Sequence, residues 1–235
     1  MSHDGYFRRR HLPHWDVEGK PIFITACLEG SISAAGLQSI ERYRLELEER
    51  PRPEQMLPAD WKHHKLKLVF AFIDDLLDNQ SAAKHLADER QAQIVQDAFL
   101  HFAATRYALL AFVVMPSHHH WLFWPDEKWA IAAAEESRKA GSPRTPREII
   151  SHSVQSYTAT MCNRVRSTTG PYWQTETFDH WARDEAEMFR IMDYIERNPV
   201  KAGLVERPED WKWSSARLRA QSGQQPGTPI SKIER

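Results

Sequence analysis

The sequence of residues 107–124 is YALLAFVVMPSHHHWLFW, two apolar and aromatic runs separated by a Pro-Ser break. Each run has the length and the β-branched or aromatic content of a strand. Two strands joined by so short a break most simply pair antiparallel, as a hairpin. A hairpin of strands at 107–115 and 118–124 is therefore the expected centre of the fold.

The segments around this hairpin alternate between strand and helix patterns. Residues 21–28 (PIFITACL) have strand composition, and Ile94, Ala98, Phe99 and Phe102 recur at helical spacing. Thr145 followed three residues later by a glutamate is a capping box. The predicted core order is strand 21–28, helix 87–105, strands 107–115 and 118–124, helix 146–168, one or two strands within 172–183, and helix 184–198, with Pro199 expected to end it.

This order is typical of an α+β fold of the ferredoxin-like class, an antiparallel sheet with helices packed on one face. A single domain is expected over 1–216, with an elaboration at about 32–86 and a flexible C-terminal tail at 217–235. Residues 126–144 suggest a loop or a loose helix.

Composition excludes several classes of protein. The chain has 235 residues, 31 Lys+Arg, 32 Asp+Glu and 2 Cys. Cys27 and Cys162 lie in no CxxC pair, which argues against a thiolate zinc site. No apolar run approaches the ~20 residues of a membrane span, and the N-terminus lacks the apolar stretch of a signal peptide. A cytoplasmic protein with no membrane partner is expected.

The net charge of −1 conceals a local excess of basic residues. Residues 138–167 contain six basic side chains and one acid, a local net charge of +5. A second basic spot is the triplet at 8–10. Such an excess indicates either a solvated helix face or a nucleic-acid contact.

The tripeptide at 118–120 is the first candidate for chemistry. On a strand, His118 and His120 point to the same face and can place two imidazole nitrogens on one cation, whereas His119 points to the other face. The alternative is three unrelated histidines in a chain that has 12.

A second candidate pair lies in the last predicted helix. Tyr194 and Asn198 are four residues apart and share one helix face. A tyrosine hydroxyl is a weak oxygen nucleophile that needs a nearby cation, and an asparagine carbonyl oxygen can ligate a metal. The alternative is a tyrosine that packs on the sheet.

Taken in order, these pieces resemble the REP-associated tyrosine transposases, relatives of the single-tyrosine HUH transposases of small insertion sequences. The similarity covers 8–30 and about 105–216. The matching pieces are LPH at 12–14, AFVVMPSHHH at 111–120, QSYT at 155–158, GPYWQ at 170–174, FDH at 178–180, RDE at 183–185, YIERNPVKAGLV at 194–205 and PEDWKWSS at 208–215.

The resemblance implies the HUH fold and a definite chemistry. His118 and His120 match the family's metal-binding histidines, Tyr194 matches its nucleophile, and Asn198 stands where relatives place a third ligand. Mg²⁺ or Mn²⁺ would polarise a phosphate of single-stranded or stem-loop DNA of REP-like palindromic elements. Attack by the tyrosine would give a 5′-phosphotyrosine intermediate and a free 3′-OH, which permits strand transfer.

Three positions depart from the family pattern. Ser117 replaces the usual Asn, His119 replaces an apolar residue, and His180 replaces an Arg or Tyr. His119 is expected to be neutral and hydrogen-bonded, or to lie near an edge. Two alternatives therefore stay open: a catalytically inactive DNA- or RNA-binding module, and a metal-dependent phosphodiesterase that uses water. The sequence does not decide between a monomer and a homodimer.

Binding of DNA requires basic groups for phosphates and aromatic faces for bases. Tyr172 and Trp181 are further aromatic candidates. The predicted DNA-binding residues are Arg8, Arg9, Arg10, His14, Arg144, Arg147, Arg164, Arg166, Trp173 and Arg183.

Overall fold

The computed structural model describes residues 6–9, 13–16, 19–175, 177–225 and 227–230. Its strands are β1 (Tyr6–Arg9), β2 (Pro13–Asp16), β3 (Ile22–Cys27), β4 (Tyr107–Val114), β5 (His118–Pro125) and β6 (Phe178–Trp181). Its α-helices are α1 (Ala34–Glu49), α2 (Pro58–Gln80), α3 (Glu89–His101), α4 (Glu127–Lys139), α5 (Pro146–Arg166), α6 (Glu185–Lys201) and α7 (Ser215–Ser222), and two 3-10 turns, η1 (His85–Ala87) and η2 (Pro208–Asp210), connect them.

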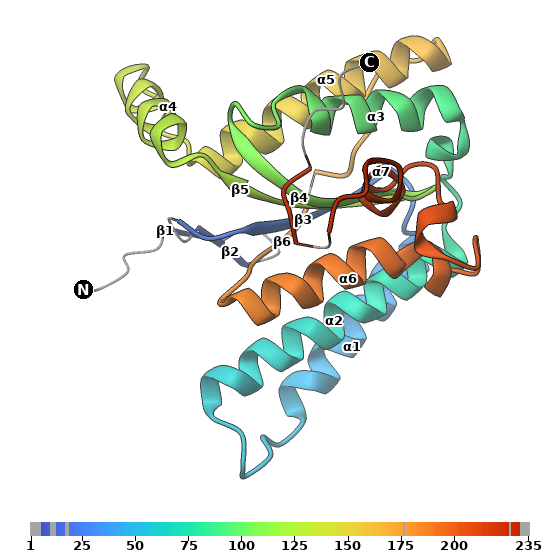
Figure 1. Cartoon of the computed structure of the whole chain (residues 1–235). Coiled ribbons are helices and arrows are strands. Elements are labelled where there is room, and N and C mark those ends of the chain that lie inside the picture. The colour runs from blue at the N-terminus through green and yellow to red at the C-terminus, as the bar shows by residue number, and fades with distance from the viewer. Residues whose placement is uncertain (1–5, 10–12, 17–18, 176, 226, 231–235) are drawn as a thin grey trace.

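The central sheet has four strands in the order β4-β5-β3-β6, and all of its pairings are antiparallel. The β4–β5 hairpin predicted from residues 107–124 is present. β1 and β2 form a separate two-stranded hairpin, drawn beside β6 in Figure 1. The predicted α+β class and antiparallel sheet are confirmed.

Helices cover both faces of the sheet, which corrects the prediction that they pack on one. Alternate residues of β3 show this. Ile22 and Ile24 pack in the cluster that holds the buried side chains of α3 and α5, whereas Phe23 packs with Met192 and Ile195 of α6. In Figure 1, α3 and α5 lie on one side of the sheet and α6, α2 and α1 on the other.

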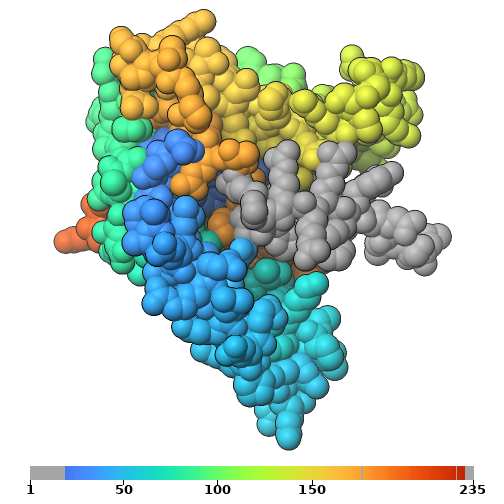
Figure 2. Space-filling model, turned by 180° about the vertical axis from the view of Figure 1, so that it is seen from behind, coloured from blue at the N-terminus to red at the C-terminus, as the bar shows by residue number. Residues whose placement is uncertain are grey.

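The second layer exists because residues 32–86 contribute it. The α1–α2 pair is a helical hairpin whose link contains Pro51 and Pro53, and it projects from the rest of the molecule (Figures 1 and 2). Its buried side chains, including Ile40 and Ile73, pack together and against Cys27 of β3. The segment that the sequence predicted only as an elaboration thus covers part of the sheet.

The structure differs from the prediction at the end of α6 and at the start of the expected tail. α6 continues past Pro199 to Lys201, and the turn is held by bonds from Ala202 N to Asn198 O at 2.9 Å and from Leu204 N to Pro199 O at 2.9 Å. A proline inside a helix loses its own N–H bond and crowds the carbonyl four residues earlier, and α6 continues through Pro199 in spite of both costs. Residues 217–222, expected in a flexible tail, belong to α7, and buried Arg219 anchors it by donating to the carbonyl of Leu110.

Among the described residues, no helix is both long enough and apolar enough to span a membrane.

Candidate active site

β5 aims His118 and His120 at the sheet face that α6 and α2 cover. The opposite orientation of His119 follows from strand alternation. The Nε2 atoms of His118 and His120 lie 3.1 Å apart, and both side chains are fully buried. The structure therefore brings the predicted pair together with converging ring nitrogens.

Neighbouring hydroxyls orient both rings. Ser117 Oγ donates to the carbonyl of Leu77 at 3.1 Å, and it lies 2.9 Å from His118 Nδ1. Since its own proton is used, the serine oxygen accepts a proton from Nδ1, and the lone pair of a neutral His118 lies on Nε2. Thr25 Oγ1 lies 2.6 Å from His120 Nδ1, so a hydroxyl also holds the orientation of that ring. Ser117, a departure from the family pattern, thus acts as an orienting partner.

α6 supplies the predicted nucleophile and the predicted third ligand. The amide of Asn198 lies 3.4 Å from the hydroxyl of Tyr194 and 3.4 Å from Nε2 of His120. Asn198 is buried at the sheet, one helical turn from Tyr194. The i, i+4 spacing that the sequence showed does place both side chains at the histidines.

Asp74 of α2 lies at the centre of this group, and sequence reasoning missed it. Its Oδ1 lies 3.1 Å from Nε2 of His120 and 3.7 Å from Nε2 of His118. Its Oδ2 accepts hydrogen bonds from Tyr194 at 2.5 Å and from Lys201 at 2.8 Å. We call Asp74, His118, His120, Tyr194, Asn198 and Lys201 the Tyr194 cluster.

The sequence did carry a signal for Asp74. Ile73, Leu76 and Leu77 form the apolar face of α2 and are buried. Asp74 is a carboxylate set into that face, and a buried charge normally has a partner or a function. Without a motif in 32–86, nothing indicated what the partner would be.

The electrostatics of the cluster follow from burial. Burial and the neighbouring His120 lower the pKa of His118 to about 3, so its imidazole is neutral at pH 7. Burial would raise the pKa of Asp74, but its contacts with His120, His118 and Lys201 outweigh burial and hold the pKa well below its ordinary value. Burial and the charge of Asp74 raise the pKa of Tyr194 well above its ordinary value.

The donor set fits a divalent cation. His118, His120 and Asp74 present one ligand atom each within 4.8 Å of one another. Asp74 Oδ1 and Asn198 Oδ1 are buried and make no hydrogen bond within the part of the chain that the structure describes. Two imidazole nitrogens and two such oxygens form a mixed set that accepts Mg²⁺, Mn²⁺ or Zn²⁺.

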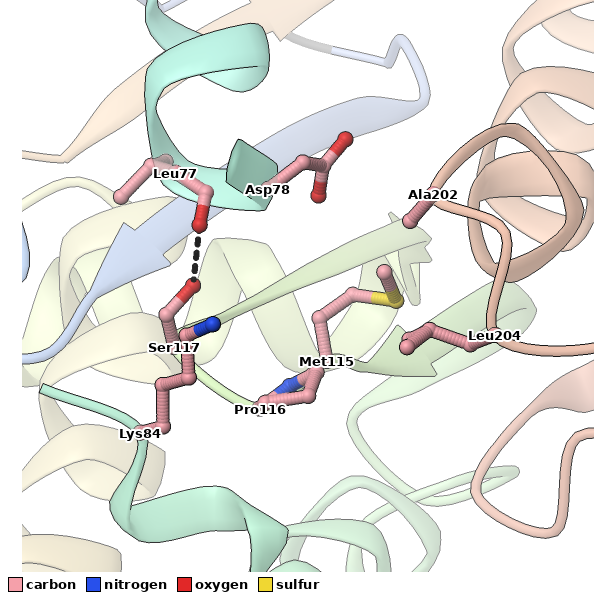
Figure 3. A pocket seen from close by; sticks show the side chains of 8 residues that line it. All are labelled: Leu77, Asp78, Lys84, Met115, Pro116, Ser117, Ala202 and Leu204. Atoms are coloured by element: carbon pink, nitrogen blue, oxygen red, sulfur yellow. Dashed lines mark hydrogen bonds between the residues drawn. The ribbon is translucent and has the colours of Figure 1, made fainter. Parts of the chain in front are cut away.

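A pocket opens beside the cluster, at the turn between β4 and β5 (Figure 3). Its wall includes Ser117, which contacts the ring of His118, and the buried carboxyl of Asp78. Burial raises the pKa of Asp78 to about 7, and the charge of Asp74 adds to the effect. The lining residues are Leu77, Asp78, Lys84, Met115, Pro116, Ser117, Ala202 and Leu204.

The predicted DNA-binding residues do not gather at the cluster. Arg144, Arg164 and Arg166 lie at the two ends of α5, on the opposite face of the sheet from Tyr194. Arg144 and Arg164 are exposed, and Arg166 lies 6.0 Å from the ring of Tyr172. Arg183 precedes α6 and bonds to Glu187.

The N-terminal candidates are only partly described. The backbone of Arg8 and Arg9 lies in β1, and that of His14 lies in β2, where it pairs with Arg8. Arg10 lies outside the described residues.

Two of the predicted DNA-binding residues have side chains that are engaged inside the protein. Arg147 is buried and forms an ion pair with Asp179 of β6 at 3.0 Å. Trp173 is buried, and its indole N–H donates to Thr158 at 2.9 Å. Neither side chain presents a surface to a phosphate or a base.

His119 corrects another expectation. It is buried, and burial lowers its pKa well below the ordinary value, as expected for a neutral ring. It lies on an interior strand, however, and neither ring nitrogen has a hydrogen-bond partner among the described residues. Its ring packs against Phe99 and Trp173, with centroids 5.1 Å and 4.9 Å away.

Comparison with known proteins gives one short sequence similarity. No family model matches the chain. A segment of 53 residues is 40% identical to a Haemophilus influenzae protein named as a REP-associated tyrosine transposase. The match covers 23% of this chain and only 30% of that relative's length. In this segment the chain is thus similar to the family that its motifs resemble.

One solved structure is similar over the whole chain. It is a structure of a REP-associated tyrosine transposase bound to a REP hairpin, aligned over 100% of this chain and 95% of that one. The aligned residues are 17% identical, and the TM-score is 0.48.

Proposed function

We propose that this chain is a metal-dependent DNA transferase that cuts and rejoins single-stranded or hairpin DNA, with Tyr194 as its nucleophile. One observation carries the proposal. The hydroxyl of Tyr194 bonds at 2.5 Å to a carboxylate that also lies 3.1 Å from His120. A nucleophile, two histidines and an acid from α6, β5 and α2 therefore meet at one point. The similarity of one segment to a protein named as a REP-associated tyrosine transposase supports the same proposal.

The protein groups that would hold the cation are His118, His120 and Asp74, with the carbonyl oxygen of Asn198 as a further ligand. Asp74 is an addition to the ligands that the sequence suggested. Bound there, Mg²⁺ or Mn²⁺ would act as a Lewis acid on a non-bridging phosphate oxygen. Ser117 and Thr25 keep the two imidazoles turned toward that position.

Tyr194 would attack phosphorus with its phenolic oxygen. Asp74 Oδ2 accepts the phenolic proton in a hydrogen bond in the resting protein, but the pKa of Asp74 is too low for it to act as the base, so the proton passes to water. As the new P–O bond to tyrosine forms, the bond from phosphorus to the 3′ oxygen breaks, and the proton is returned to that oxygen. The products are a 5′-phosphotyrosine and a 3′-OH, so the phosphodiester energy is kept for rejoining.

Lys201 is suited to charge compensation during this step. Its ammonium group lies 2.8 Å from Asp74 Oδ2 and 6.0 Å from the ring of Tyr194. A cation in that position favours the anionic form of a phenol and the negative charge on a transferring phosphate.

The experiment is a denaturing gel of the full chain after incubation with labelled REP-like hairpin DNA and Mn²⁺. Wild type is expected to give a labelled band at the mass of the protein, and Tyr194→Phe is expected to give none. Tyr157→Phe is the matched control, because Tyr157 is an exposed tyrosine on α5. Chelation of the metal should remove the band from wild type.

The gel also separates the two alternatives. Cleavage that survives Tyr194→Phe would indicate a phosphodiesterase that uses water. Binding of DNA without any cleavage by wild type would indicate a non-catalytic binding module. The burial of Asp74, His118 and His120 is the observation that favours this module.

A further inference from the structure

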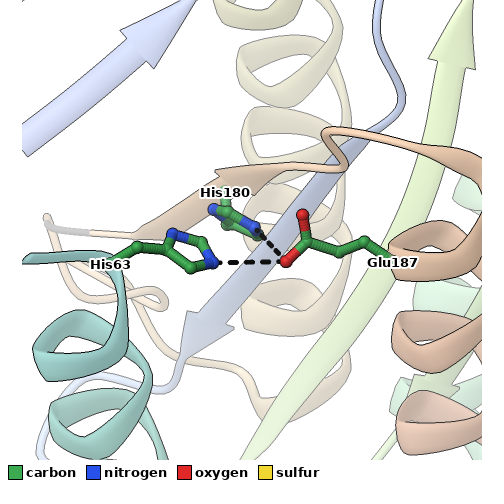
Figure 4. Close-up of side chains that lie close together, drawn as sticks. All are labelled: His63, His180 and Glu187. Carbon is green, nitrogen blue, oxygen red and sulfur yellow. Dashed lines mark hydrogen bonds and ion pairs between the residues drawn. The ribbon is translucent and has the colours of Figure 1, made fainter. Parts of the chain in front are cut away.

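A second group of metal-ligating side chains lies apart from the Tyr194 cluster within the described part of the chain. It consists of His63 on α2, His180 on β6 and Glu187 on α6, drawn in Figure 4. One ligand atom from each residue lies within 4.8 Å of the other two. The two imidazoles are partly exposed, and the carboxylate is buried.

Both imidazoles aim at the same carboxylate oxygen. Nε2 of His63 lies 3.2 Å from Glu187 Oε1, and Nε2 of His180 lies 3.4 Å from it. The rings approach with centroids 4.8 Å apart. Nε2 of His180 is shielded from solvent and makes no hydrogen bond to any described residue. A buried ring nitrogen without a hydrogen bond requires an explanation, and a bound ion is one.

These separations match the edges of a tetrahedral zinc site. With Zn–N and Zn–O bonds of about 2.0–2.1 Å, two ligand atoms of a tetrahedron lie about 3.4 Å apart. Two histidines and one glutamate form a ligand set that zinc uses with a fourth, open position. Burial is the largest of the effects that lower the pKa of His63, so its nitrogen is available to a metal at neutral pH.

We propose that His63, His180 and Glu187 form a zinc site that ties α2 to β6 and α6. The site is separate from the reaction proposed above and would exist whether or not Tyr194 is a nucleophile. His180 is one of the three departures from the family pattern noted in the sequence, and this role accounts for a histidine at that position.

Two cationic side chains already pair with Glu187, and zinc binding requires one of them to move. Arg183 bonds to Oε2 through its backbone N–H at 3.1 Å and through Nε at 3.0 Å. It can stay in place and orient the carboxylate. Lys67 donates to Oε1 at 2.9 Å and must release that oxygen. Its side chain is 48% exposed, so its ammonium group can move into water.

A zinc ion at this site would affect the Tyr194 cluster through α2. His63, Lys67, Phe70 and Asp74 follow one another at intervals of four, three and four residues, which places them on one helix face. Phe70 lies between Lys67 and Asp74 on that face, and its ring contacts those of Tyr194 and Phe178. Zinc at His63 would thus hold the helix that carries Asp74.

The test counts bound metal. The full chain is stripped with a chelator and titrated with Zn²⁺ by calorimetry, and then with Co²⁺, whose visible absorption reports a tetrahedral site. His63→Ala and His180→Ala are each expected to lose one bound Zn²⁺ per chain and the tetrahedral Co²⁺ absorption of that one site, whatever metal the Tyr194 cluster binds. His64→Ala is the matched control, because His64 is the next residue on α2, is exposed and stacks on Trp61 instead. Equal stoichiometry and affinity in wild type, His63→Ala and His180→Ala would overturn the proposal.

Lys67→Met gives a test that does not depend on weakening the fold. Because Lys67 competes for Oε1, its removal is expected to tighten zinc binding and to enlarge the rise in Tm that Zn²⁺ produces. If these residues formed only a hydrogen-bonded network, zinc affinity would not change in Lys67→Met. That result would overturn the proposal even if the alanine variants unfolded.

Discussion

Tyr194 donates a hydrogen bond of 2.5 Å to Asp74, a residue 120 positions away on a different helix. Burial and the charge of this carboxylate are what raise the pKa of the phenol. Asp74→Asn removes the negative charge, so the phenolate becomes less unfavourable and the pKa of Tyr194 should fall. NMR of tyrosine labelled at the ring carbon that bears the hydroxyl would measure it.

Asp75→Asn is the control for this titration, since Asp75 is the exposed neighbour on α2. An unchanged pKa of Tyr194 in Asp74→Asn would show that burial alone sets it. Binding of Mn²⁺ to the cluster should also weaken in Asp74→Asn and not in Asp75→Asn.

His119→Leu is expected to stabilise the protein. A buried imidazole whose two nitrogens lack partners carries an uncompensated desolvation cost of about 1–3 kcal/mol, and leucine has no such cost. Urea denaturation would show a higher midpoint with an unchanged slope. A lower midpoint would mean that the contacts of the ring with Phe99 and Trp173 outweigh that cost. Formation of the covalent DNA adduct should persist, because His119 faces away from the Tyr194 cluster.

Arg147→Met should destabilise the fold, although Arg147 is a basic residue in the most basic stretch of the chain. The change breaks the buried ion pair between Arg147 and Asp179, a loss of about 3–5 kcal/mol. The double variant Arg147→Met/Asp179→Leu should recover much of that loss, which chemical denaturation would measure. Arg144→Met is the control, because Arg144 is exposed and should tolerate the change. A small effect of Arg147→Met would argue that the pair is open to water.

Asp78 should make stability depend on pH in the direction opposite to most carboxylates. Burial, followed by the charge of Asp74, raises its pKa to about 7 in the folded protein. The unfolded chain, with an ordinary pKa of about 3.9, releases this proton first as pH rises. The contribution of Asp78 to the free energy of unfolding is therefore largest below that value and is lost as pH rises toward 7.

Tm measured between about pH 4 and 8 in the presence of a chelator would test this sign. Asp78→Asn, which cannot ionise, should be more stable relative to wild type at pH 8 than at pH 4. The reverse order would mean that Lys201, which lies 3.9 Å from Asp78, controls its ionisation.

The sequence predicts local structure well where a pattern and its cause lie close together. Strand alternation placed His118 and His120 on one face, and helical spacing placed Tyr194 beside Asn198. Thr145 does cap α5 through the predicted capping box. In each case the partners lie within a few residues, so local geometry determines the outcome.

The rest depends on contacts between distant segments. Asp74 and His63 lie in residues 32–86, where no motif indicates which side of the sheet the helices will cover. The burial of Arg147 required its partner Asp179 on β6, 32 positions later in the chain. Pro199 shows another limit, because α6 continues through it to Lys201, which the residue alone does not predict.

The cover that α2 and α6 place over the Tyr194 cluster has a kinetic consequence. Asp74, His118, His120 and Asn198 are at most 1% exposed, so a phosphodiester cannot reach them while the two helices stay together. In the proposed reaction, entry of a DNA strand would then require part of this cover to move, and collective movements of packed elements take microseconds to milliseconds or longer. The rate of the first turnover would then be limited by this opening. A DNA strand that favours the open form would be selected before any bond is broken.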